Sequence, residues 1–178
     1  MHLLATTSGV IDGAAEAIDL KQFPADVIIL TAADSELASL ASAHDALGDE
    51  APTLRLANLM HLQHNFAVDL YAEKTCTKAK LIIIRSLGGA SYWPYGVDVI
   101  KALAREQNIK LAIIPGGKDP DPSLSARSTI NATDCERLRQ YFVCGGHDNA
   151  QNILHFANHL LHQTPAPAPA EPLPASEF

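Results

Sequence analysis

The residues best suited to binding chemistry lie in one short stretch, Arg85 to Gly96, with the sequence RSLGGASYWPYG. This stretch contains the only tryptophan of the chain, Trp93, and two of its four tyrosines, Tyr92 and Tyr95. The apolar run that precedes it, residues 81–84, is typical of a strand that is covered on both faces. Open α/β sheets bind ligands beyond the carboxyl ends of such strands, so we expect a substrate or partner site here.

Each candidate in this stretch has a structural as well as a binding interpretation. Arg85 is suited to bidentate pairing with a substrate carboxylate, but it could equally hold the loop or cap a helix. The aromatic side chains could stack on a flat ligand, or they could fill the gap between the loop and the sheet. The substrate- or partner-binding residues that we predict in the loop are Arg85, Gly88, Gly89, Tyr92, Trp93, Tyr95 and Gly96.

A second and weaker candidate is the turn Thr7-Ser8-Gly9, which follows an apolar segment at residues 2–6. Such a turn can present backbone N–H groups to a ligand, although phosphate-binding loops contain more glycines than this one. A plain turn between a strand and a helix explains the same residues. We keep Thr7, Ser8 and Gly9 as predicted binding residues.

Common signatures of catalysis, nucleotide binding and metal binding are missing from the sequence. It contains no GxGxxG, GxxxxGK[ST] or GxSxG motif, and its three cysteines form no CxxC pair. His155, His159 and His162 have helical spacing, but we expect them on the solvent side of the last helix, opposite its apolar stripe. His61 and His64 have no further ligand nearby in the sequence. We therefore predict no metal site.

Alternating strand and helix patterns predict the framework that positions the loop. Strands are expected at the apolar runs 2–6, 26–31, 54–57, 81–85 and 110–114, with helices between them. The fold class is therefore α/β, with a doubly wound, mostly parallel, five-stranded sheet in a flavodoxin-like three-layer sandwich, followed by C-terminal helices. Counting the strands along the chain, we expect the order 2-1-3-4-5.

Local signals predict the ends of two helices. Ile100 and Ala104 would share the buried face of a helix that Asn108 ends in the left-handed conformation. Thr133 and Glu136 have the spacing of a capping box, so we expect the next helix to be capped by Thr133.

Composition predicts one domain and restricts its partners. The chain has 178 residues and a net charge of −7, which argues against nucleic acid or an anionic membrane as the main partner. We expect an α/β head domain at residues 1–162 and a Pro/Ala-rich linker at residues 163–178. The N-terminus lacks the pattern of a secretory signal, and the odd number of cysteines is typical of reduced thiols. These features predict a cytoplasmic location.

Five stretches between residues 3 and 96 carry a resemblance that covers about residues 1–162: LLATTSGVID, PADVIILTAAD, LRLANLMHLQH, VDLYAEKT and IIIRSLGGASYWPYG. Together they resemble the N-terminal part of the large subunit of the aerobic cobaltochelatase. That subunit is similar to the porphyrin-binding large subunit of magnesium chelatase. The most specific element of the resemblance is GGxxYWxYG, here Gly88 to Gly96.

The resemblance implies an enzyme that inserts Co²⁺ into a corrin substrate, hydrogenobyrinic acid a,c-diamide, during aerobic cobalamin biosynthesis. The implied partners are the remainder of the large subunit, an AAA+ ATPase subunit and a subunit with a metal-ion-dependent adhesion domain. ATP and Mg²⁺ would bind to those subunits, and no cofactor is expected on this chain. Because the family members are several times longer, no catalytic residue is assigned here, and the chain alone should be inactive. A non-catalytic docking scaffold and a stand-alone flavodoxin-like small-molecule binder remain as alternatives.

Overall fold

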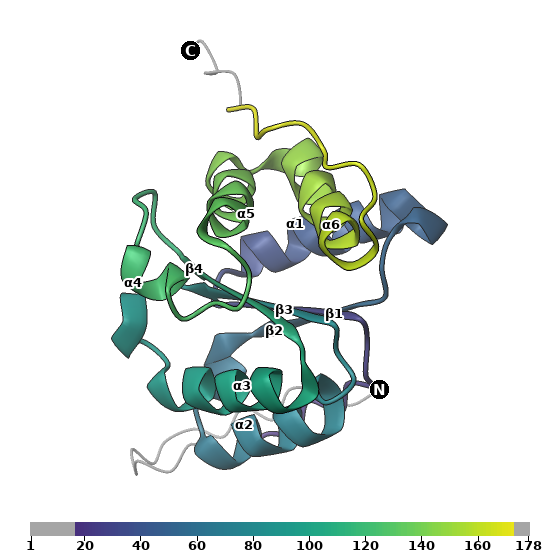
Figure 1. Ribbon diagram of the computed structural model, residues 1–178. Helices are drawn as coiled ribbons and strands as arrows, with labels where there is room; N and C mark the ends of the chain where they lie inside the picture. Colours follow the sequence, from purple (N-terminus) through teal and green to yellow (C-terminus); the bar gives the residue numbers. More distant parts are fainter. Residues whose placement is uncertain (1–16, 173–178) are drawn as a thin grey trace, which may run out of the picture.

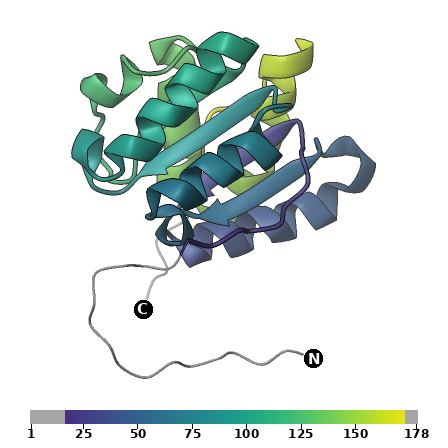
Figure 2. The same ribbon diagram turned by 90° about the horizontal axis from the view of Figure 1, so that it is seen from below.

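The computed structural model describes residues 17–172, which form a parallel sheet with helices on both faces (Figure 1). Its four strands have the order β2-β1-β3-β4, and every neighbouring pair is parallel. Helices α1, α5 and α6 cover one face, and α2 and α3 cover the other, as the second view also shows (Figure 2). In chain order the elements are β1 (Val27–Thr31), α1 (Asp34–Leu47), η1 (Gly48–Glu50), β2 (Leu54–Asn58), η2 (Leu59–Leu62), α2 (Asn65–Tyr71), η3 (Ala72–Cys76), β3 (Leu81–Ser86), η4 (Gly89–Ser91), α3 (Pro94–Gln107), β4 (Lys110–Pro115), α4 (Pro122–Ser125), α5 (Ala132–Cys144) and α6 (Gly146–His162).

Alternating side chains along the strands divide the core into two layers. Ile82 and Ile84 of β3 pack with residues of α2 and α3, whereas Leu81 and Ile83 pack with residues of α1, α5 and α6. All six residues of β3 are buried. An uninterrupted apolar run is therefore the correct signature of this central strand, because both of its faces are covered.

The prediction of an α/β fold is confirmed, but the predicted strand order is wrong. It placed residues 2–6 between 26–31 and 54–57, whereas β1 is hydrogen-bonded to β2 on one side and to β3 on the other. Both edges of β1 are thus occupied, and no further strand can lie beside it. The expected strand at residues 2–6 lies outside the described residues, so a five-stranded sheet stays a prediction.

Helix ends follow some of the local signals and depart from others. Asn108 ends α3 in the left-handed conformation, with φ 55°, as predicted. The capping box predicted from Thr133 is wrong, because the side chain of Asn131 accepts a hydrogen bond from the Asp134 amide and starts α5 two residues earlier. Among the helices of residues 17–172, none combines the length and the apolar content needed to cross a membrane.

The Pro/Ala-rich segment does not project freely over its described part, residues 164–172. It runs along α5 and α6 (Figure 1), where its carbonyl groups accept hydrogen bonds from side chains of those helices. Tyr141 Oη donates to the Ala168 carbonyl at 2.6 Å, and Asn149 Nδ2 donates to the Glu171 carbonyl at 3.0 Å. Ala170 also packs on the core layer under α6. We call residues 164–172 the strap. That residues 163–178 link this domain to another stays a prediction.

Candidate functional site at the carboxyl edge of the sheet

The predicted site lies where the chain changes direction across the sheet. After β1 the chain crosses to β2 on one side, and after β3 it crosses to β4 on the other side. The carboxyl ends of β1 and β3 therefore form the topological switch point, which is the usual ligand position in open α/β sheets. Thr31 and Arg85 are paired in register at this point.

Arg85 fills the switch point and is engaged by the protein itself. Its side chain is only 4% exposed, and Nε donates to Glu36 Oε1 at 2.9 Å. Both terminal guanidinium nitrogens donate to backbone carbonyls at the end of β4, those of Pro115 and Gly116. The guanidinium also lies over the ring of Phe142, 5.0 Å from its centroid.

Glu36 completes this network from the first turn of α1. Its Oε2 accepts a hydrogen bond of 2.7 Å from Thr31 Oγ1, so one carboxylate connects the ends of β1 and β3. The guanidinium is thus shared between a carboxylate, two carbonyl groups and an aromatic face. Of the two interpretations of Arg85, these contacts support the one in which it holds the loops. All three nitrogens of the guanidinium already donate to protein acceptors, and the side chain is only 4% exposed, so little of it is open to a substrate carboxylate.

Trp93 is the internal anchor of the aromatic loop. It is 6% exposed, and its Nε1 donates to the Leu62 carbonyl at 2.7 Å. Gly96 makes room for it, since a Cβ at that position would come within 1.9 Å of the indole ring. The indole therefore packs under the loop and fills the gap above the sheet, and it is not presented to a flat ligand.

Tyr92 and Tyr95 are the aromatic residues of the loop that face outward, with 37% and 38% of their surface exposed. Tyr92 Oη lies 3.5 Å from the sulfur of Met60, which follows β2 and is itself 52% exposed. Tyr95 Oη donates to the Asp69 carboxylate of α2 at 2.8 Å, and this hydrogen bond raises the pKa of the Tyr95 hydroxyl above its usual value. We call Met60, Tyr92 and Tyr95 the aromatic rim.

The two remaining glycines of the loop, Gly88 and Gly89, allow backbone conformations and contacts that a larger residue would prevent. A Cβ on Gly88 would approach the Tyr92 ring to 2.7 Å, so glycine allows that tyrosine to lie close to the chain. Gly89 has φ +72°, a conformation that disfavours other residues, and its carbonyl accepts a hydrogen bond from Ser86 Oγ at 2.7 Å. Together they fix the path of the loop that carries the aromatic rim.

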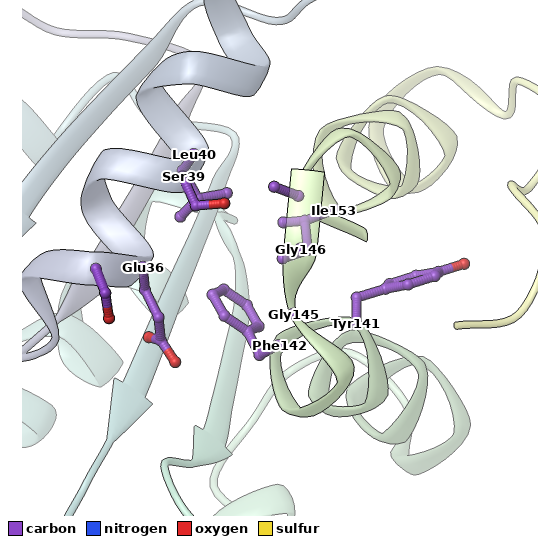
Figure 3. A pocket seen from close by; sticks show the side chains of 10 residues that line it. Glu36, Ser39, Leu40, Tyr141, Phe142, Gly145, Gly146 and Ile153 are labelled. Carbon is purple, nitrogen blue, oxygen red and sulfur yellow. The ribbon is translucent and has the colours of Figure 1, made fainter. Parts of the chain in front are cut away.

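A cavity of about 330 Å³ adjoins the Arg85 network between α1, α5 and α6 (Figure 3). It lies on the face of the sheet that is opposite to α2 and α3. Figure 3 shows Phe142 pointing toward α1, whereas the ring of Tyr141 points to the opposite side of α5. Glu36 is the only charged residue of its lining, and its carboxylate is already paired with Arg85. The cavity is at the small end for ligand sites and offers no free charge for an anionic or cationic ligand.

Other predicted features contribute no site in the described part of the chain. Thr7, Ser8 and Gly9 lie outside the described residues. His162 is exposed, whereas His155 and His159 are half-buried, so the expectation of a purely solvent-facing histidine stripe is only partly correct. Over residues 17–172, no group of three or more His, Cys, Asp and Glu side chains is placed to hold a metal ion.

Three contributors to this edge were not predicted from the sequence: Glu36, Met60 and Asp69. Each lies 26 to 49 residues from its partner in the loop. Glu36 lies in the first turn of α1, shortly after a buried strand, and this position is the one local signal that could have predicted it as a site residue. Contacts over such separations depend on the strand order, which the sequence did not reveal.

The fold and this edge together define a doubly wound parallel α/β domain with exposed aromatic side chains at the carboxyl ends of its strands. No protein-family model matches the chain. The chain is 46% identical over 173 residues to the aerobic cobaltochelatase subunit CobN of a Sinorhizobium species, covering 97% of this chain and 14% of that relative. It is also 46% identical over 153 residues to CobN of Pseudomonas aeruginosa, covering 84% of this chain and 12% of the relative.

A solved structure agrees with these relatives. The catalytic subunit of cobaltochelatase from Mycobacterium tuberculosis matches with a TM-score of 0.67 and 26% identity, over 84% of this chain and 12% of that one. The chain is thus homologous to the N-terminal part of the aerobic cobaltochelatase subunit CobN, as the resemblance implied. It spans about one seventh of the length of the curated relatives.

Proposed function

We propose that this chain is the N-terminal part of a cobaltochelatase large subunit, which inserts Co²⁺ into hydrogenobyrinic acid a,c-diamide in aerobic cobalamin biosynthesis. The observation that carries the proposal is the 46% identity to a CobN subunit over 97% of the chain. In the working enzyme, an AAA+ ATPase subunit and a subunit with a metal-ion-dependent adhesion domain bind ATP and Mg²⁺ and drive insertion. The assembly works in the cytoplasm, and Co²⁺ is its substrate.

The role that we infer for this domain is binding, without a catalytic residue or a cofactor of its own. Inserting a metal ion requires that water be removed from the ion and kept out of the site, which favours an enclosed position for the macrocycle. The aromatic rim supports a contact of this kind, because two tyrosine rings and a methionine offer apolar surface with polar tips. We infer that the rim faces the corrin substrate or the remainder of the large subunit.

A non-catalytic docking scaffold is the second candidate, and two specific observations favour it. Arg85 and Trp93, the residues best suited to hold a carboxylate and a flat ring, are both occupied by internal contacts. A domain whose switch point is filled in this way is better suited to present a rigid surface than to enclose a small molecule. The same contacts argue against a stand-alone flavodoxin-like binder.

Reconstitution of the full-length large subunit tests the proposed function. The subunit would be mixed with its two partner subunits, ATP, Mg²⁺, Co²⁺ and hydrogenobyrinic acid a,c-diamide, and cobalt insertion followed by the absorbance of the corrin. We expect insertion that requires ATP and every subunit. A folded full-length subunit that binds its partners but inserts no cobalt into this corrin would contradict the proposal.

A further inference from the structure

A basic groove lies near the amino-terminal end of β4, whereas the aromatic rim lies at the carboxyl ends of the strands. Its volume is about 530 Å³, and it lies between the end of α3, the start of β4 and the segment after α4. Four cationic side chains line it: Lys101 and Arg105 of α3, Lys110 of β4, and Arg127. The chain has 13 Lys and Arg residues and a net charge of −7, so nearly a third of its cationic side chains gather at this one place.

The cations of the groove are not neutralised by partners within residues 17–172. The ion pairs found there use other basic residues, and no Asp or Glu is among the residues that line the groove. Carboxylates do occur in the neighbouring sequence, Asp98 and Glu106 on α3 and Asp119 and Asp121 before α4. The pKa of the Asp121 carboxyl is lowered mainly by its hydrogen bond from Ser123, and the charge of Arg127 adds a smaller effect without forming an ion pair.

Helix stability alone does not account for this arrangement. Arg105 is favourable near the end of α3, where the helix dipole attracts a cation. Lys101 lies one turn before it, however, and like charges at that spacing repel each other by a few tenths of a kcal/mol. Lys110 and Arg127 come from different elements, so an effect at the end of one helix cannot explain them.

The position of the groove favours a polypeptide partner over a small ligand. Small ligands of open α/β sheets bind at the carboxyl ends of the strands, whereas Lys110 is the first residue of β4. The backbone edge of β4 is also taken, since Leu111 and Ile113 amides donate to Thr129 Oγ1 and Ser128 Oγ. An added strand could not pair there, so recognition would rest on carboxylate side chains that reach the cations.

We propose that this groove docks an acidic segment of another subunit of the chelatase assembly. This inference rests on the proposed function, because the relatives are subunits of the aerobic cobaltochelatase, which implies further subunits. The overall negative charge of the chain disfavours acidic partners at a distance, so a local basic groove would determine where such a partner binds and in which orientation.

Charge reversal in the full-length large subunit tests the proposal. The groove variant is Arg105→Glu/Lys110→Glu, since both side chains are exposed, and the control is Lys78→Glu/Lys118→Glu, which has the same charge change at exposed residues outside the groove lining. Affinity for each partner subunit would be measured by biolayer interferometry. Each exposed charge pair changes affinity by about 1.4- to 5-fold, so we expect the groove variant to lose about tenfold for one partner subunit. The affinity of the wild-type subunit should decrease as the salt concentration is raised from about 0.05 M to about 0.3 M. The affinity of the groove variant should decrease less steeply over the same range.

A fluorescein-labelled oligoglutamate peptide provides a direct probe of the groove, with inorganic triphosphate and poly(U) as competitors. Binding of the peptide that is lost in the groove variant and kept in the control supports the proposal. Equal losses in both variants, no loss at all, or stronger binding of triphosphate or poly(U) than of the peptide would overturn it. If the wild-type subunit inserted no cobalt, the proposed function would be contradicted. The peptide titration would still decide independently whether the groove binds acidic segments.

Discussion

Replacement of Gly96 by alanine tests whether Trp93 anchors the aromatic loop. Two physical effects of this change act on the free energy of unfolding in opposite directions. Gly96 lies in the first turn of α3, where an alanine would by itself stabilise the helix by up to about 1 kcal/mol. The new Cβ, however, would lie 1.9 Å from Cε2 and 2.1 Å from Cζ2 of Trp93. Ordinary carbon contacts need about 3.5 Å, so the indole would have to move by roughly 1.5 Å.

Displacing the Trp93 indole should destabilise the fold by more than the alanine stabilises helix α3. Overpacking in a core costs about 1–3 kcal/mol, and weakening the Trp93–Leu62 hydrogen bond adds about 0.5–1.5 kcal/mol. Against the gain in helix propensity, we expect a net destabilisation of about 1–3 kcal/mol. Urea unfolding of the 178-residue chain, followed by circular dichroism, would measure it. Trp93 fluorescence should shift to longer wavelength because the indole becomes more exposed.

Gly117→Ala is the matched control. A Cβ at Gly117 meets nothing within 4 Å, and its backbone is not in the left-handed region. We expect it to be neutral or to stabilise by up to about 1 kcal/mol, through the unfolded state. If Gly96→Ala proved as stable as this control, with unchanged Trp93 emission, the account of the indole as the anchor of the loop would be refuted.

Three further changes test other parts of the structure. Arg85→Ala should destabilise the chain by about 2–4 kcal/mol in urea unfolding, because Glu36 would remain partly buried without its cation; a loss below about 1 kcal/mol would contradict the network. Tyr141→Phe should cost about 0.5–1.5 kcal/mol and speed proteolytic cleavage of the strap, since its hydroxyl holds a strap carbonyl at 2.6 Å; cleavage at the wild-type rate would argue against this contact. Iodoacetamide at about pH 8 should modify Cys144 before Cys76, because burial raises the pKa of the Cys76 thiol to about 12; mass spectrometry showing equal rates would contradict it.

The positions of the described strands were predictable because each is recorded in a local apolar run. The runs near 26–31, 81–85 and 110–114 became β1, β3 and β4, since strands covered on both faces need continuous apolar sequence, whereas the mixed stretch 54–57, which includes Arg55, became the edge strand β2. The strand order was not predictable, because nothing local in residues 54–57 says which side of β1 they will join.

Arg85 and the aromatic loop lie at the carboxyl end of a strand, as the sequence indicated, whereas their role in binding a substrate or partner stays a prediction. Sequence placed Arg85 at a strand end, yet its role depends on Glu36, which lies 49 residues away. Trp93 and Tyr95 looked equivalent in the sequence, and only packing separates the buried anchor from the exposed ring. The basic groove was missed for the same reason, because its four cations come from three separate segments that the fold brings together.

The most direct test of the central claim compares cobalt insertion by full-length large subunits that carry changes in this domain. The double variant Tyr92→Ala/Tyr95→Ala removes both tyrosines of the aromatic rim. The control is Phe23→Ala, at a side chain that is 78% exposed and lies outside the rim. With partner subunits and ATP present, we expect the rim variant to lose about tenfold or more in kcat/KM while the control keeps wild-type activity. Wild-type insertion by a rim variant that is folded and assembled would contradict a role for this edge in the chelatase.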